Sequence, residues 1–130
     1  MKTYLLTVLS FLLIDAIWIV GVAGPLYSRH LPNDFLADPV RLLPSGLFYA
    51  LFTWALWYLY IRRHKLINKS LLIDVFIFGT VAYSTYALTN QAIIADWNWY
   101  VTLPDMLWGG ILSTLITLLV FKTNSLLSSS

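Results

Sequence analysis

Two aspartates inside long apolar stretches are the residues of this sequence best suited to chemistry. Asp15 stands three residues before Trp18, and Asp105 stands three residues before Trp108. This spacing places both members of a pair on one face of a helix. An aspartate at the centre of a membrane helix costs about 2.5–3.5 kcal/mol to insert, so such residues usually face the bundle interior and have a function. We therefore predict that the four side chains share one ligand-binding site.

A polar stripe in the third apolar stretch is predicted to complete this site. Tyr83, Tyr86 and Asn90 recur at the spacing of one helix face. Hydroxyl and amide groups donate hydrogen bonds to carboxylates, which lowers the cost of burying them. We predict that these three residues orient the ligand and that Asn90 shares a pocket with Asp105.

The two aspartates have no Lys or Arg within the apolar stretches to serve as a counter-ion. A carboxyl group buried without a counter-ion tends to be protonated or to bind a cation. The sequence therefore leaves open proton exchange, a metal ion and a basic ligand. Arg29 or Arg41, from the segment after the first apolar stretch, is a further candidate for neutralising the aspartates.

The sequence lacks the motifs of common cofactor and enzyme sites. It has no cysteine, no glutamate, and no zinc-protease, Walker or Gly-rich nucleotide motif. His30 and His64 fall on opposite sides of the membrane in the topology given below, so they cannot share a metal ion. We predict no metal site and no cofactor. We also reject a nucleic-acid partner, because basic residues in membrane proteins usually report topology.

The elements that must position these residues are membrane-spanning helices. The 130 residues are 59% hydrophobic and 11% charged, less than half the roughly 25% charge of soluble domains. This composition excludes an ordinary soluble enzyme and a disordered chain. Because about 20 apolar residues cross a bilayer, we predict one all-α transmembrane domain over 1–130, an antiparallel bundle of four helices. Its spans are about 3–22, 42–61, 71–88 and 102–121, and an outer loop covers 24–44.

The basic residues predict the orientation of the bundle. Six of them fall on the side of the membrane that holds the two chain ends, and only two fall on the other side. Cytoplasmic loops carry the excess of Lys and Arg, so we predict that both termini are cytoplasmic. An outer aromatic belt is then expected, formed by Tyr27, Trp97, Trp99 and Tyr100.

Two further features concern packing. The outer segment 24–44 holds four prolines, and we expect it to lie on the membrane surface with one short helical turn after Asn33. Gly109, Ser113 and Thr117 recur every four residues, a spacing that lets helix backbones approach closely. We interpret this stripe as internal packing, with a homodimer face as the alternative.

The residues singled out above also carry a family resemblance. It rests on the segments LLIDAIW at 12–18, YSRHL at 27–31, VAYSTYALTN at 81–90 and DMLWG at 105–109. Together they resemble a family of small bacterial membrane proteins, domain of unknown function 2177, over nearly the whole chain. The resemblance implies a four-span integral membrane protein and no established activity. The family pattern has an acid where this chain has Ala87, which puts any family mechanism through that position in doubt here.

These observations lead to one main hypothesis and two alternatives. We expect a protein of the bacterial cytoplasmic membrane that binds or transports a small molecule or ion at an acidic, aromatic-lined site in the outer half of the bilayer. Its expected partners are the bilayer and a small-molecule, cationic or lipid ligand. The alternatives are an enzyme acting on a lipid or isoprenoid, with the paired acids as general acid and base, and a structural subunit of a larger complex.

Overall fold

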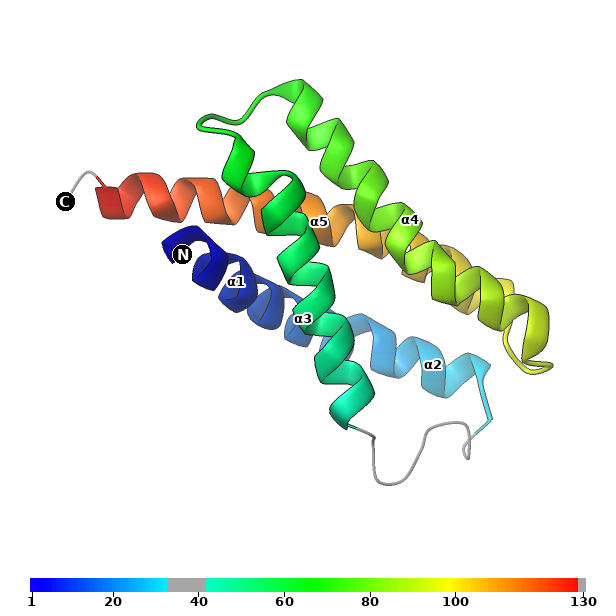
Figure 1. Ribbon diagram of the computed structural model, residues 1–130. Helices are drawn as coiled ribbons and strands as arrows, with labels where there is room; N and C mark the ends of the chain where they lie inside the picture. The colour runs from blue at the N-terminus through cyan, green and yellow to red at the C-terminus, as the bar shows by residue number, and fades with distance from the viewer. Residues whose placement is uncertain (33–41, 129–130) are drawn as a thin grey trace.

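The protein is a bundle of long apolar helices (Figure 1). The structure, a computed structural model, describes residues 1–32 and 42–128. Over these ranges the chain is helical and contains no strand. Four helical stretches are long and apolar enough to cross a membrane: Lys2–His30, Leu42–Arg63, Lys69–Ile93 and Trp99–Ser128. They contain the four predicted spans, and the predicted all-α membrane fold is confirmed.

The first helical stretch is longer than predicted. It consists of α1 (Lys2–Trp18), a π-helical turn (Ile19–Ala23) and α2 (Gly24–His30), so the expectation of a loop from residue 24 is wrong for its first turns. Pro25 explains the π-helical turn, because its ring would clash with the carbonyl four residues back in a regular α-helix. The wider turn lets the Gly24 N–H bond to the Ile19 carbonyl, and Pro25 sits in the first turn of α2, where no N–H is needed.

The remaining elements alternate in direction. They are α3 (Leu42–Leu59), a short 3-10 turn (Ile61–Arg63), α4 (Lys69–Ile93) and α5 (Trp99–Ser128). Asn68 caps the N-terminus of α4, and its side chain accepts a hydrogen bond of 2.8 Å from the Leu71 N–H. The N-terminus, the last turns of α5 and the α3–α4 link lie at the same end of the bundle (Figure 1). The predicted helical turn after Asn33 lies outside the described residues.

The core lies between α5 and the helices around it. α5 contacts α1, α2 and α4, and its buried Leu112 and Ile116 join Phe11, Phe52 and Val75 in one apolar cluster. The outer surface is also apolar: Leu9 is 62% exposed and Leu51 is 65% exposed. An apolar surface of this extent suits contact with lipid tails.

α3 crosses the bundle obliquely (Figure 1). Its backbone packs on α1, whereas it reaches α4 through aromatic rings. The Phe52 ring centre lies 5.6 Å from that of Phe78 and 5.7 Å from that of Tyr83. α3 is therefore held to α4 by bulky side chains, which set a wider spacing than the one between α4 and α5.

Two glycines set the close packing of α4 on α5. A Cβ built on Gly79 would overlap the Gly109 carbonyl oxygen, and a Cβ on Gly109 would overlap the Gly79 carbonyl oxygen. Ser113 and Thr117 are fully buried on the same stripe of α5. The predicted small-residue stripe thus packs inside the chain, and it offers no exposed face to a second copy.

This contact predicts a specific sensitivity to side-chain size. The Gly109→Ala substitution should lower the free energy of unfolding by about 1–3 kcal/mol, the usual cost of overpacking, because the opposing atoms are backbone and cannot move aside. Unfolding in detergent, followed by circular dichroism, measures the change. Gly46→Ala is the control, since a Cβ at Gly46 meets nothing within 4 Å. An equal loss in both variants would refute the close contact.

Candidate functional site

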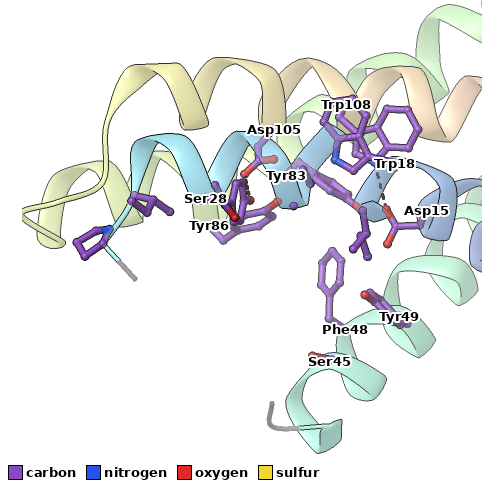
Figure 2. Close-up of a pocket in the computed structure, with 16 residues that line it drawn as sticks. Asp15, Trp18, Ser28, Ser45, Phe48, Tyr49, Tyr83, Tyr86, Asp105 and Trp108 are labelled. Atoms are coloured by element: carbon purple, nitrogen blue, oxygen red, sulfur yellow. Dashed lines mark hydrogen bonds between the residues drawn. The ribbon is translucent and has the colours of Figure 1, made fainter. Parts of the chain in front are cut away.

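A cavity of about 620 Å³ brings the predicted site residues together (Figure 2). All four long helical stretches contribute side chains to its wall. The wall includes six of the seven predicted residues: Asp15, Trp18, Tyr83, Tyr86, Asp105 and Trp108. The sequence placed these residues on three separate helices, and the tertiary structure places them around one space.

The two Asp–Trp pairs interlock across the α1–α5 contact. The Trp108 indole N–H donates a hydrogen bond of 3.2 Å to the Asp15 carboxyl group, which is only 7% exposed. The Trp18 and Trp108 rings stack with their centres 4.3 Å apart and an interplanar angle of 5°. The two indoles therefore form a flat wall together, and Trp108 also supplies the hydrogen-bond donor for Asp15.

Asp105 has its own donor on α2. The Tyr27 hydroxyl donates a hydrogen bond to the Asp105 carboxyl group, which is 2% exposed. The sequence predicted Tyr27 in the outer aromatic belt, and its role in the site was missed. The π-helical turn is the reason, because it keeps the chain helical past Pro25, and the helix that follows packs against α5.

The aromatic wall is completed by residues of α3 and α4. Tyr83 and Tyr86 line the cavity with ring centres 5.6 Å apart, and the Phe48 ring lies 5.8 Å from that of Tyr83. The Tyr49 side chain interacts with the Asp15 carboxyl group. Sequence reasoning missed Phe48 and Tyr49, because aromatic residues in an apolar span look the same whether they pack against helices or line a cavity.

Asn90 is not among the described residues that line the cavity. Asn90 therefore does not join Asp105 at this cavity. The next residue, Gln91, makes the α4–α5 contact: its side-chain oxygen accepts a 2.7 Å hydrogen bond from the Thr102 hydroxyl. A helix turns by about 100° per residue, so a pattern that names the right helix can still miss the facing residue by one position.

The cavity is acidic over the described part of its wall. Its two carboxyl groups are close enough to interact electrostatically, and no Lys, Arg or His stands among its described lining residues. Arg29 does not line it, and Arg41 lies outside the described residues. No group of three or more residues that could ligate a metal occurs within 1–32 and 42–128.

These features define an integral membrane protein of four helices, with a cavity at which two buried acids meet an aromatic wall. The chain belongs to the family described as "Predicted membrane protein (DUF2177)", whose model matches residues 1–122. This match confirms the resemblance drawn from the sequence. Neither the curated proteins nor the solved structures gave a match to the chain.

The Tyr27 hydrogen bond predicts a stability effect at a position that looked like a membrane anchor. Tyr27→Phe should lower the free energy of unfolding by about 1–3 kcal/mol, because it leaves the buried Asp105 carboxyl group without this donor. Tyr100→Phe is the matched control, since Tyr100 is 71% exposed and should change little. Unfolding in detergent reports both variants, and equal effects would argue against the Tyr27–Asp105 bond.

Proposed function

We propose that this protein binds a small organic cation, such as a protonated amine, in the cavity between Asp15 and Asp105. The observation that carries the proposal is the placement of two buried carboxyl groups in one aromatic-lined space. A bound cation would supply the positive charge that the described wall does not contain. A ligand amine can also donate hydrogen bonds to both carboxyl groups, which lowers the cost of burying them.

The size of the cavity favours an organic cation over a bare metal ion. Small-molecule sites usually enclose about 300–1,000 Å³, and this cavity encloses about 620 Å³. A magnesium or calcium ion takes six or more oxygen ligands at about 2.0–2.6 Å. Such a shell would fill only part of this space, whereas the apolar body of an organic cation would fill the rest.

The aromatic wall favours a cation with an apolar body. The faces of Trp and Tyr rings attract cations, and the attraction reaches about 2 kcal/mol or more where water is excluded. Trp18 and Trp108 supply two indoles, and Tyr83 and Tyr86 supply two phenol rings. A ligand with both a positive charge and apolar groups would use the acids and the rings together.

Transport is the use of this site that we place first. Both helical stretches that carry the acids are irregular beside them: the π-helical turn lies four residues after Asp15, and Pro104 interrupts the hydrogen bonding of α5 directly before Asp105. π-helical turns occur frequently at functional sites, and interrupted helices form the binding sites of many transporters. These irregularities favour local movement around a bound cation.

The acids should be required for binding. Benzyltrimethylammonium serves as the probe, with benzyl alcohol as its neutral counterpart, and quenching of tryptophan fluorescence in nanodiscs reports binding. Asp15→Asn and Asp105→Asn should each weaken binding of the probe by about tenfold to a hundredfold, because each substitution removes one negative charge from beside the bound cation. Uptake of the same probe by proteoliposomes should fall in parallel.

Asp74→Asn is the matched control for this experiment. It makes the same substitution in α4, at an exposed residue that does not line the cavity, and should leave binding unchanged. Equal binding of the probe and benzyl alcohol, or equal effects of all three substitutions, would contradict the proposal. If the protein binds the probe but proteoliposomes do not take it up, the binding site is supported and the transport function is rejected.

We also propose that both termini face the cytoplasm of a bacterial inner membrane. Six of the eight basic residues lie on the same side of the membrane as the two chain ends, and cytoplasmic segments carry the excess of Lys and Arg. The chain has no cysteine, so single introduced cysteines can be labelled without background. A membrane-impermeant maleimide should label Ala95→Cys in intact cells, because Ala95 is exposed in the link between α4 and α5. It should label Ser70→Cys, at an exposed residue in the first turn of α4, only after lysis. The reverse pattern would invert the topology.

A further inference from the structure

A second cavity lies at the other end of the bundle, and its chemistry is the opposite of the first. It encloses about 750 Å³ among the start of α1, the link between α3 and α4, and the last turns of α5. This is the end at which Figure 1 places the N-terminus and the end of α5. The cavity therefore opens where the bundle meets the membrane–water interface.

The polar part of this cavity is basic. Lys65 and Lys122 come from the α3–α4 link and from α5, and His64 lies beside them. No aspartate stands among the described lining residues, and the chain has no glutamate. Two lysines from segments far apart in the sequence thus line one space, with no acidic residue in the described wall.

His64 lines this cavity with one of its ring nitrogens already bonded. Its Nδ1 lies 2.8 Å from the Tyr60 carbonyl oxygen, and a carbonyl oxygen only accepts hydrogen bonds, so Nδ1 carries the proton in this bond. Nε2 is the remaining ring nitrogen. The two lysines, rather than His64, therefore supply the positive charge of this wall. Asn124 and Ser125 add neutral donors to the same wall.

Much of the remaining cavity wall is apolar, and part of it is exposed at the surface of the bundle. Leu66, Leu118 and Phe121 belong to its wall, and Leu66 is 79% exposed. A soluble anion such as inorganic phosphate would leave these side chains without a partner. A molecule with an anionic head and an apolar chain would cover them.

The neighbouring arginine shows that not every basic residue at this end is available. The Arg62 guanidinium stacks over the Tyr58 ring at 3.8 Å from the ring centre, and its Nε donates a 2.8 Å hydrogen bond to the Tyr58 carbonyl. Arg62 does not line the cavity. The two lysines are thus the strong positive charges of this particular space.

We propose that this cavity binds one anionic phospholipid, with the phosphate group between Lys65 and Lys122 and an acyl chain along Leu66, Leu118 and Phe121. Basic pockets between membrane helices are known to hold anionic headgroups. The bound lipid would contact both the α3–α4 link and the end of α5. This site is separate from the acidic cavity and does not depend on the function proposed for it.

Native mass spectrometry of the full chain, released from mixed micelles, tests this proposal. The probes are phosphatidylglycerol, phosphatidylcholine and inorganic phosphate, each added separately. Wild-type protein should retain one phosphatidylglycerol per chain and little of the other two. Lys65→Gln combined with Lys122→Gln should weaken phosphatidylglycerol retention by about thirtyfold. Each lysine near an anionic headgroup raises the affinity roughly fivefold, and the double substitution removes two of them.

Two variants control for charge and for folding. Lys2→Gln combined with Lys69→Gln removes the same charge from the same end of the bundle, at residues that do not line the cavity, and should retain the lipid. Lys65→Arg combined with Lys122→Arg keeps both charges and should also retain it. If both double Lys→Gln variants lost phosphatidylglycerol equally, the lipid would be held by the overall positive charge of this end and not by the cavity, and the proposal would be overturned. Retention of phosphatidylcholine or of inorganic phosphate at the level of phosphatidylglycerol would overturn it as well.

Discussion

The constraint on which this structure depends is the cost of placing two carboxyl groups where water is scarce. In a bilayer every buried polar group needs a partner within the protein, and an unpartnered acid would oppose insertion of its helix. The bundle meets this requirement with donors from neighbouring helices. Trp108 donates to Asp15 and Tyr27 donates to Asp105. Each acid on one helix is thus tied to a ring on another, and the acids hold the bundle together around the cavity.

These hydrogen bonds require the helices to approach at the right depth and in the right rotation. The glycine contact between α4 and α5 brings Tyr83 close to α5, because no side chain separates the two backbones at Gly79 and Gly109. The π-helical turn lets the helix continue past Pro25 into α2, which packs on α5 and carries the Tyr27 hydroxyl to Asp105. Aromatic rings keep α3 at a greater distance. Close packing on one side and wide packing on the other leave the space that becomes the cavity.

The two cavities lie at opposite ends of the bundle, and the charged residues in their walls have opposite signs. One cavity holds two acids within an aromatic wall, and the other holds two lysines beside an apolar surface. In a chain with only 11% charged residues, this separation gives the ends distinct chemistry. The acidic end suits a cation with an apolar body, and the basic end suits the headgroup and chain of an anionic lipid.

The sequence by itself determined the class of fold, since stretches of about 20 apolar residues have few stable alternatives to membrane helices. It also identified the acids and their tryptophans, because a charge is costly in such a stretch and a spacing of three defines a helix face. Ala87 is fully buried one turn from Tyr83. Its neighbours and its distance from the acids could not be read from the chain.

Only the tertiary structure decided which residues meet. Tyr27, Phe48 and Tyr49 joined the site, and Asn90 did not. The α3 aromatics look like ordinary packing residues in the sequence, and Tyr27 depends on a helix that continues past a proline. The physical reason is that periodicity specifies a face of one helix, whereas a site depends on the rotation and spacing between helices. Those are set by contacts such as Gly79 with Gly109, which join residues far apart in the chain.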